Sequence, residues 1–422
     1  MKKSRVFFTT ILLCFLILAL IYYFFSTPSS SVDNLVLSQT RFSKLEGWNN
    51  DNLLEAFNAF KHSCKKIVNQ PDEISMGGKL VSAIGIEPLA GIVGDWKYIC
   101  KDALSADIQD NNLSKLFFQK WFLPFAISNG KTDSTFFRGD DLGLFTGYYE
   151  PLVKGSMIKN YQYNEPLHEF PKHYIKVDLT NFFPKSNDKY IIGKINNGNL
   201  IPADTRKQIY EGALENKANV LVWLKSPIDS FFLHIQGSGV IELSNGSYVR
   251  VGYAGNNGYK YYPIGKKLIE LGHISKEKMS MQEIRKWLKL NPKKMNNLFN
   301  INKRYIFFKE IKSGFPLGSF GVPLTPGRSL AIDKRWIAMG VPVWLSAAQT
   351  KDYSKDFNFN RLMITQDTGS AIKGIVRGDI FYGNGKLASD LAGRTNHLGR
   401  YYILLPRKLI QNRIKDYSNE KK

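Results

Sequence analysis

Two aspartates carry the clearest chemical signal in this sequence. Asp367 and Asp379 lie twelve residues apart in the run ITQDTGSAIKGIVRGDIFYGNG. Residues 370–373 between them predict a turn and residues 375–376 a strand, so the chain can return Asp379 close to Asp367. Two carboxylates that share a site push their pKa values apart, and one can then hold a proton near neutral pH. Such a carboxyl group can act as a general acid on a glycosidic oxygen.

Other kinds of catalytic site find no support in the sequence. An aspartate beside a glycine is often only a turn residue, so the pair alone is weak evidence. The six histidines form no metal-binding motif, and no nucleophile elbow, Walker loop or Rossmann glycine loop is present, so we predict no metal and no cofactor. His234 lies in residues 231–236, an apolar run that predicts a strand with a hydrogen-bonded histidine.

Aromatic and polar residues cluster in three glycine-containing runs: FTGYYEP at 145–151, HIQGSG at 234–239 and VGYAGNNG at 251–258. Aromatic rings can cover the apolar faces of sugars, while hydroxyl and amide groups bind sugar hydroxyls. The same residues also fit ordinary core tyrosines and turn glycines, and the runs alone do not decide between the two readings.

The elements that must position these residues fall into three regions. Residues 36–119 show helical spacing of apolar residues. Short β-rich runs follow from residue 136, notably at 144–149, 190–192, 220–224, 231–236 and 240–243. A helical stretch interrupts them, marked by Pro263, Gly272 and a capping box of Ser280 with Glu283, and ends at residues 291–292. Glycine-rich β texture returns at 319–406, and the end from Lys415 predicts a frayed tail.

Composition narrows the class of protein. The chain has 422 residues, which suggests two or three domains, and 43% hydrophobic residues, which excludes a disordered chain. The net charge of +22 favours anionic partners, but the basic residues are scattered and no nucleic-acid-binding motif is present. We therefore predict no nucleic-acid partner; a solvated basic face or contact with an acidic cell-wall polymer or anionic membrane accounts for the charge.

The first residues predict export from the cytoplasm. Lys2, Lys3 and Arg5 precede an apolar run at 6–25 that is long enough to span a bilayer and lacks a small-residue cleavage site. We read residues 1–31 as an uncleaved membrane anchor and tether, with a cleaved signal peptide as the alternative. Export leaves Cys64 and Cys100 either as a disulfide or as two separate thiols, and the sequence does not choose between these states.

The motif blocks resemble the membrane-bound lytic murein transglycosylase A family. The blocks occur in the same order as in that family and spread from residue 145 to residue 406. They are FTGYYEP, FFLHIQGSG, VGYAGNNG with YYPIGKKLI, GVPLTPGRSLAIDKRWIAMGVPVWL, QDTGSAIKG, RGDIFYGNG and AGRTNHLGRYYILLP. The resemblance implies a mainly β fold with an N-terminal helical region, in which a double-psi β-barrel carries a second, inserted β-domain with a groove between them. The family is usually lipid-anchored through an N-terminal cysteine, a signal that this chain lacks.

The resemblance also implies domain limits. Residues 32–152 hold the helical region and the first part of the barrel, 153–305 the inserted domain, 306–410 the second part of the barrel with a three-aspartate motif, and 411–422 a tail.

Residue roles follow from the resemblance as well. Asp379 matches the catalytic acid and base, Asp367 the supporting aspartate, and Asp333 a structural aspartate of the motif. Thr146 matches a groove residue near the catalytic aspartate, and Gln236, Gly237 and Ser238 lie in the block expected to face the groove from the inserted domain. The further candidates for substrate binding are Tyr148, Tyr149 and Lys373.

The implied reaction is cleavage of the β-1,4 bond between N-acetylmuramic acid and N-acetylglucosamine in peptidoglycan, with a 1,6-anhydro product and no water consumed. One aspartate can serve first as acid and then as base. The alternatives are a non-catalytic peptidoglycan-binding scaffold and a polysaccharide hydrolase on the same barrel. The expected location is the periplasmic side of a Gram-negative envelope, with glycan strands as partner and the membrane contacted through the N-terminal segment. The sequence does not set the oligomeric state or choose between end-wise and internal cleavage.

Overall fold

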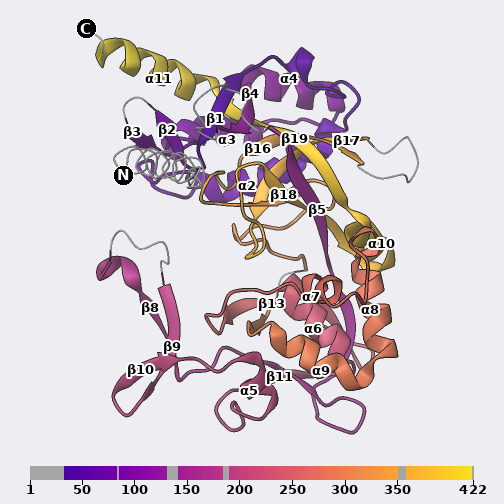
Figure 1. The fold of residues 1–422 in the computed structure, drawn as a ribbon. Coiled ribbons are helices and arrows are strands. Elements are labelled where there is room, and N and C mark those ends of the chain that lie inside the picture. Colours follow the sequence, from indigo (N-terminus) through magenta and orange to yellow (C-terminus); the bar gives the residue numbers. More distant parts are fainter. Residues whose placement is uncertain are drawn as a thin grey trace, which may run out of the picture.

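The computed structural model describes residues 33–82, 85–130, 141–183, 190–312, 314–349 and 358–420. The predicted anchor at residues 1–31 lies outside these ranges. Among the described residues, no helix is both long and apolar enough to cross a membrane. The chain forms two lobes, with the N-terminal helices and the C-terminal strands in one and the middle of the chain in the other (Figure 1).

The first lobe is built around a barrel of six strands. Their order is β19-β16-β17-β15-β18-β5, and β5 pairs back with β19, so the ring of pairings closes. The β15–β17 and β18–β5 pairs are parallel and the other pairs of the ring are antiparallel. The six strands are β5 (Gly143–Glu150), β15 (Ser329–Ile332), β16 (Pro342–Gln349), β17 (Asn358–Asp367), β18 (Arg377–Asn384) and β19 (Asn396–Pro406).

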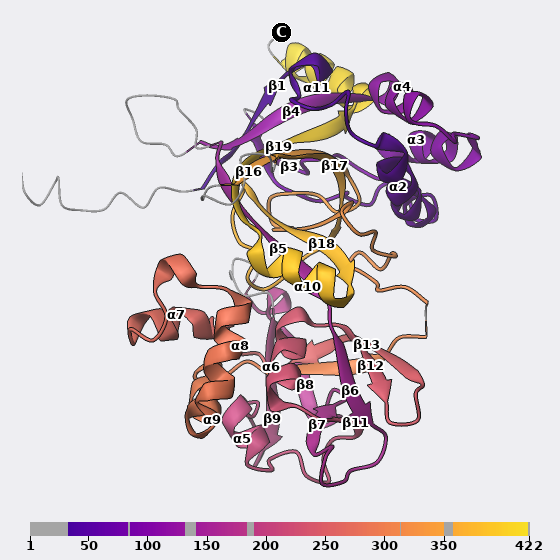
Figure 2. The ribbon, with the colours of Figure 1, turned by 90° about the vertical axis from the view of Figure 1, so that its right-hand side faces the viewer.

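Helices of the N-terminal region cover this barrel (Figure 2). Their apolar faces join the barrel strands in one core, in which Phe57, Trp96 and Trp344 are fully buried. Strands interrupt the region at residues 35–39, 80–82 and 85–87, so the prediction of helix throughout 36–119 was too broad. The elements are β1 (Leu35–Gln39), α2 (Leu53–Ile67), β2 (Leu80–Ser82), β3 (Gly85–Glu87), α3 (Gly94–Ser105), α4 (Asn111–Trp121) and β4 (Phe122–Asn129), with β1 and β4 extending the barrel sheet beyond β19.

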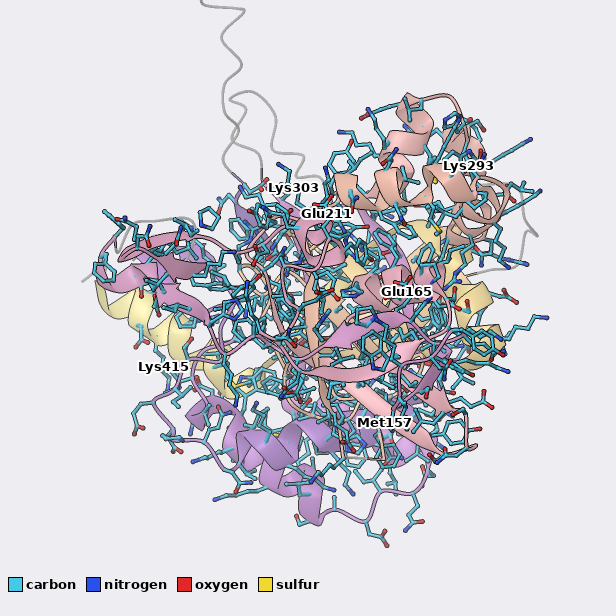
Figure 3. The ribbon with its side chains drawn as sticks, turned by 90° about the horizontal axis from the view of Figure 1, so that it is seen from below. Met157, Glu165, Glu211, Lys293, Lys303 and Lys415 are labelled. Atoms are coloured by element: carbon cyan, nitrogen blue, oxygen red, sulfur yellow. A yellow bond between two sulfur atoms is a disulfide. The ribbon has the colours of Figure 1, made fainter. Side chains whose placement is uncertain are left out.

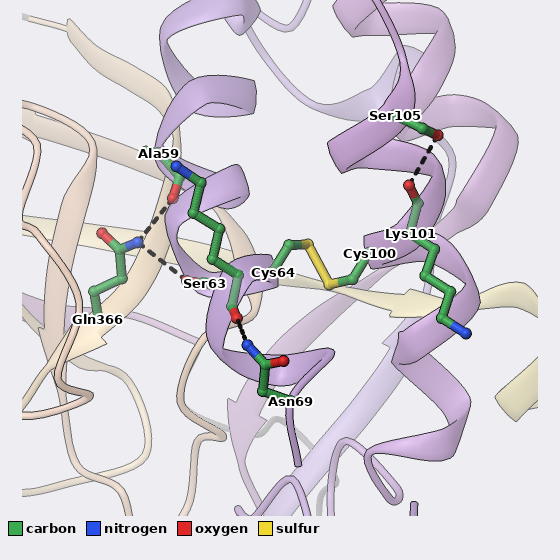
Figure 4. The surroundings of a disulfide bond; sticks show 9 residues. Ala59, Ser63, Cys64, Asn69, Cys100, Lys101, Ser105 and Gln366 are labelled. Atoms are coloured by element: carbon green, nitrogen blue, oxygen red, sulfur yellow. Dashed lines mark hydrogen bonds between the residues drawn. A yellow bond between two sulfur atoms is a disulfide. The ribbon is translucent and has the colours of Figure 1, made fainter.

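A disulfide joins Cys64 on α2 to Cys100 on α3. Both cysteines are fully buried in the core that the helices share with the barrel. The bond resolves the choice that the sequence left open, and it fixes α2 against α3 beside the barrel wall (Figure 4).

The second lobe contains a six-stranded sheet in the order β14-β13-β12-β6-β11-β7 and a three-stranded sheet, β10-β9-β8. The strands of the larger sheet are β6 (Leu152–Ser156), β7 (Glu165–His168), β11 (Val220–Leu224), β12 (Gly239–Leu243), β13 (Tyr248–Asn256) and β14 (Ile306–Glu310); those of the smaller are β8 (Tyr174–Asp178), β9 (Tyr190–Asn196) and β10 (Asn199–Pro202). The predicted architecture is therefore confirmed: the fold is mainly β, and its barrel, drawn from two separated chain segments, carries an inserted β-domain. The domain limits drawn from the sequence remain predictions.

Residues 231–236 are helical, and the prediction of a strand there was wrong. They belong to α6 (Pro227–Gln236). The Ser226 side chain caps this helix by accepting a hydrogen bond from the amide of Asp229, Pro227 occupies the first turn, and Gly237 ends the helix at φ +77°. His234 is buried in the helix and accepts a hydrogen bond at Nδ1 from the amide of Ile306, 3.1 Å away.

The helices predicted near Pro263 and at Ser280 are present as α7 (Ile264–Glu270) and α8 (Met281–Leu290), and Ser280 accepts the amide of Glu283 as expected. The tail expected at 411–422 is instead helical as far as the structure describes it, in α11 (Arg407–Glu420). Glu211, Lys293 and Lys303 of the inserted lobe are exposed (Figure 3). The remaining helices are α5 (Arg206–Tyr210), α9 (Pro292–Ile301) and α10 (Gly385–Arg394).

One strand leads from the barrel into the inserted lobe. β5 ends at Glu150 and β6 begins at Leu152, so the chain passes between lobes at Pro151 (Figure 2). The buried Glu150 carboxylate accepts hydrogen bonds from Arg250 of β13 at 2.8 and 3.1 Å. A bidentate pair of this kind fixes the direction in which β5 enters the second lobe.

Candidate active site

Asp367 and Asp379 are brought to the same part of the barrel by the strand between them. Asp367 ends β17, Asp379 lies on β18, and both pair in register with Ala331 of β15. Strands in a sheet lie about 4.8 Å apart, so the two backbones are separated by roughly 10 Å and side chains bridge the space. Residues 375–376, which the sequence assigned to a strand, precede β18, because the strand begins at Arg377.

Asp379 is held from the neighbouring parallel strand. Thr146 of β5 is its register partner, and Thr146 Oγ1 donates a hydrogen bond of 2.6 Å to Asp379 Oδ1. Arg377 Nη2 in turn donates to Thr146 Oγ1 at 2.8 Å. Burial raises the pKa of Asp379 to about 6 and the charge of Asp367 adds to the rise, while Arg377 and the Thr146 hydrogen bond oppose it. Asp379 is therefore protonated about half of the time near pH 6 and about a tenth of the time at pH 7, far more often than an ordinary aspartate.

Asp367 has more hydrogen-bond donors around it. Its carboxylate accepts from Tyr148 Oη at 2.8 Å, from the Ser319 amide at 2.9 Å and from the Thr368 amide at 2.8 Å. Burial raises its pKa, while these bonds act in the opposite direction. Because three donors stabilise the ionised form of Asp367 and one contacts Asp379, a proton shared by the pair resides on Asp379.

The four side chains of this site are only half-buried. Thr146, Tyr148, Asp367 and Asp379 each keep some accessible surface, and all four belong to strands of the barrel. A proton on Asp379 can therefore reach a bound ligand. This arrangement suits general acid catalysis, because burial raises the protonated fraction of the acid and accessibility lets it react.

Asp333, the third aspartate of the motif, has a different environment. It is buried and accepts hydrogen bonds from the Arg335 side chain and from the Gly374 amide at 2.9 Å. Burial favours the neutral form, but these bonds outweigh it and hold the pKa of Asp333 below its usual range. These contacts tie the turn before β18 to the end of β15, which supports the structural role expected for Asp333. Lys373 lies exposed in that turn.

The predicted residues of the inserted lobe reach the barrel through Gln236. Its Oε1 accepts a hydrogen bond of 3.4 Å from the Tyr149 amide at the end of β5. Gly237 and Ser238 follow it directly and are half-buried. Tyr149 itself is buried against Ala388 and Ala392 of α10, so its ring packs between elements and leaves little surface for a sugar.

Sequence reasoning assigned no role to Arg377, Ser319 or Gln366. Arg377 could have been found, because it lies two residues before Asp379 and alternate residues of a strand share a face. Ser319 contacts Asp367 through a backbone amide 48 positions away, and no sequence pattern announces that contact.

A polar cavity of about 580 Å³ lies elsewhere on the barrel lobe. It is lined by residues between Glu46 and Glu55 together with Arg328, Asn360 and Arg361. The Arg328 guanidinium is buried and already paired with Asp51 and Glu55, so the charges that line the cavity largely satisfy one another. None of the four side chains of the candidate site lines this cavity.

Comparisons with known proteins place the chain in a family. Residues 144–309 match the model of the MltA specific insert domain, and residues 328–405 match the 3D domain. Membrane-bound lytic murein transglycosylase A of Vibrio cholerae is 31% identical over 275 residues, which cover 63% of this chain and 67% of that protein. The chain belongs to the membrane-bound lytic murein transglycosylase A family. The Escherichia coli K12 member is 34% identical over 265 residues, so this MltA-family chain spans 65% of that relative's length.

Solved structures agree with the MltA-family assignment over more of the chain. A membrane-bound lytic murein transglycosylase from Agrobacterium tumefaciens superimposes with a TM-score of 0.76 at 29% identity, over 89% of this chain and 99% of that one. Escherichia coli MltA with bound chitohexaose matches with a TM-score of 0.55 at 27% identity, over 74% of this chain and 83% of that one. The crystallised Escherichia coli protein thus holds a sugar oligomer on a related fold.

Proposed function

We propose that this protein is a peptidoglycan lytic transglycosylase. It would cleave the β-1,4 bond between N-acetylmuramic acid and N-acetylglucosamine and leave a 1,6-anhydromuramoyl end. The single observation that carries the proposal is the half-buried Asp379 with its raised pKa, held by Thr146 in a chain of the MltA family. Escherichia coli MltA has been crystallised with bound chitohexaose, which supports a glycan as the ligand.

In the proposed mechanism Asp379 performs both proton transfers. Protonated Asp379 donates its proton to the oxygen of the bond that breaks, so the leaving sugar departs as a neutral alcohol. The carboxylate that remains then takes the proton from the C6 hydroxyl of the muramoyl sugar as that oxygen bonds to C1. The acid is regenerated and no water is consumed. Asp367, ionised beside it, favours the state in which the proton has returned to Asp379.

Thr146 and Tyr148 set the geometry of this pair. The Thr146 hydroxyl fixes the Oδ1 atom of Asp379, which leaves Oδ2 as the atom that exchanges the proton. Tyr148 donates to Asp367, and burial raises the pKa of its phenol well above the usual value, so it remains a donor across the working range of pH. The half-buried Gln236, Gly237 and Ser238 at the end of α6 would bind sugar from the inserted lobe.

The test is digestion of purified murein by the wild type, Asp379→Asn and Asp379→Ala, with mass spectrometry of the soluble products. We expect anhydro-muropeptides from the wild type and a loss of at least about 10²-fold in both variants, the lower end of general acid–base effects. Anhydro products at the wild-type rate from either variant would refute the role of Asp379. Products with free reducing ends would indicate a hydrolase, and binding to murein without products would indicate a scaffold.

The proposed site of action is the bacterial cell envelope, where murein lies. The relatives named above are called membrane-bound, which supports attachment to a membrane. Fractionation of cells that express the full chain tests this part of the proposal, since the protein should sediment with membranes and should not remain in the soluble fraction.

A further inference from the structure

β17 contains an extra residue directly before Asp367. Its parallel pairing with β15 matches Leu330 to Thr365 and then Ala331 to Asp367, so Gln366 has no partner in the register. An unpaired residue of this kind is a β-bulge, which bends the strand and changes the direction of the side chain that follows. The side chain that follows this bulge is the carboxylate of Asp367.

The Gln366 side chain is fully buried, and both the oxygen and the nitrogen of its amide group form hydrogen bonds. Its Oε1 accepts a hydrogen bond from Ser329 Oγ at 2.6 Å, and its Nε2 donates to the Ala59 carbonyl at 2.8 Å and to Ser63 Oγ at 3.0 Å. The Ala59 carbonyl can only accept, so the amide nitrogen must face α2. The backbone carbonyl of Gln366 also accepts a hydrogen bond from the Phe320 amide at 3.1 Å.

The partners of Gln366 on α2 are themselves fixed. Ala59 and Ser63 are four residues apart and lie on the same face of α2, toward the barrel. Cys64 follows Ser63 and is bonded to Cys100 of α3 on the other side of the helix (Figure 4). The amide of Gln366 is therefore clamped between a barrel strand and a helix that the disulfide holds in place.

We propose that Gln366 is a positioning residue: by locking the bulge in β17 against α2, it directs the Asp367 carboxylate toward Tyr148 and toward the charge environment of Asp379. The inference rests on the proposed function for its catalytic consequence. It goes beyond that function because it assigns control of the aspartate pair to a residue that contacts neither the second aspartate nor the substrate.

The charges around Asp379 determine the expected effect. The titratable groups that influence it or are influenced by it are Arg377 and Tyr382 of β18, Tyr148 of β5 and Asp367 of β17. Asp367 is the negative group among these that raises the pKa of Asp379. If the bulge relaxes and Asp367 turns away, this contribution falls and Asp379 loses its proton at lower pH.

The experiment compares Gln366→Met, Ser63→Ala and Ser114→Ala with the wild type. Gln366→Met keeps the length of the side chain and removes the clamp; Ser63→Ala removes one bond of the clamp and should perturb folding less. Ser114→Ala is the matched control, because Ser114 is also a fully buried helical serine, bonded to the Asp110 carbonyl at 2.9 Å on α4, a helix that supplies no partner of Gln366.

Two experiments, the kinetics of murein digestion and an NMR titration, separate a positioning role of Gln366 from a role in general stability. In murein digestion we expect kcat of Gln366→Met to fall about tenfold with KM unchanged, since misplacement of a catalytic group slows turnover. The alkaline limb of its pH profile should move to lower pH, with a smaller shift in the same direction for Ser63→Ala and none for Ser114→Ala. An equal shift in Ser114→Ala, or an unmoved limb in a folded Gln366→Met, would overturn the inference.

The second experiment, an NMR titration, does not require the protein to turn over substrate. The carboxyl carbons of ¹³C-labelled aspartates are titrated by NMR, and the Asp379 signal is identified by its loss in Asp379→Asn. The inference expects the Asp379 midpoint to fall in Gln366→Met and in Ser63→Ala; an unchanged midpoint overturns it. If the wild type proves inactive on murein, the proposed function fails, while this titration still decides whether Gln366 positions Asp367.

Discussion

Thr146 Oγ1 donates a hydrogen bond of 2.6 Å to Oδ1 of Asp379, across a parallel pair of strands whose residues lie 233 positions apart in the chain. This bond fixes Oδ1 of Asp379, the proposed acid, and among the described residues no hydrogen bond to its Oδ2 is found. The Thr146 bond also lowers the pKa of Asp379, against the larger effect of burial. The behaviour of the site can therefore be adjusted from β5 without altering either aspartate.

Removing the Thr146 hydroxyl should shift the pH profile upward. Thr146→Val keeps the shape of the side chain but removes the bond that favours the charged carboxylate, so the pKa of Asp379 rises and the alkaline limb of kcat/KM moves to higher pH. Turnover should fall about tenfold because the acid is no longer oriented. Thr146→Ser, which retains the hydroxyl, is the control and should resemble the wild type. If the alkaline limb of kcat/KM does not move in Thr146→Val, the Thr146 hydroxyl does not set the pKa of the catalytic acid.

The wild-type enzyme should lose activity as the pH rises through about 6, the pKa of Asp379. In the proposed mechanism the protonated form of the free protein is the active one, and its fraction falls tenfold for each pH unit above the pKa. The measurement is the initial rate of murein solubilisation between pH 4.5 and 8.5 at constant ionic strength. A flat profile over this range would show that no group of this kind limits the reaction.

Asp379→Asn should be more stable than the wild type at alkaline pH. The folded pKa of Asp379 is raised, so its proton favours folding, and stability falls as the pH rises through about 6. Asparagine stays neutral and accepts the Thr146 bond, so at pH 8 we expect a gain on the order of 1–3 kcal/mol in the free energy of unfolding, measured in urea. The gain should shrink toward pH 4.

Asp333→Asn should change the free energy of unfolding in the opposite direction from Asp379→Asn. The pKa of Asp333 is held low by Arg335 and Gly374, so its charge stabilises the fold above the unfolded pKa. This variant should therefore lose stability at neutral pH, and the loss should diminish in acid. Equal effects of the two substitutions would show that their electrostatic environments do not differ in the way described.

Breaking the Cys64–Cys100 disulfide should destabilise the barrel lobe by about 4 kcal/mol, since the bond closes a loop of 36 residues. The measurement is urea unfolding of Cys64→Ala/Cys100→Ala against the oxidised wild type. Thiol titration of the denatured, unreduced wild type should detect no thiol from Cys64 or Cys100, and at most the one of Cys14 in the predicted anchor. Three thiols in that titration would show that the bond does not form.

Several elements were predictable because their signals are local. The strand at Leu144–Tyr149 and the helix that starts at Ser280 follow from β-rich composition and from a capping box, and each lies where the sequence indicated. The prediction for residues 231–236 was wrong because a short, mainly apolar run fits a buried helix as well as a strand. The flanking signals, Ser226-Pro227 before it and Gly237 after it, were present and mark a helix.

The candidate site was only partly predictable. Both aspartates stand in short glycine-rich motifs, so their residue types and spacing pointed to acid catalysis. Their partners did not: Tyr148 bonds to Asp367 across 219 positions and Gln366 bonds to Ala59 across 307. Such contacts depend on the closure of the barrel and on the packing of α2, and no local pattern encodes them.

The passage of the chain through Pro151 has a consequence for how the molecule assembles. β5 must pair with β18 and β19, which the ribosome makes more than 220 residues later, whereas the inserted sheet contains all its own partners. During synthesis or translocation, the middle of the chain can fold while the barrel is still an incomplete ring with unpaired edges. The barrel can close only when about the last hundred residues are available, so the protein cannot bring Asp367 and Asp379 together until nearly the entire polypeptide has emerged.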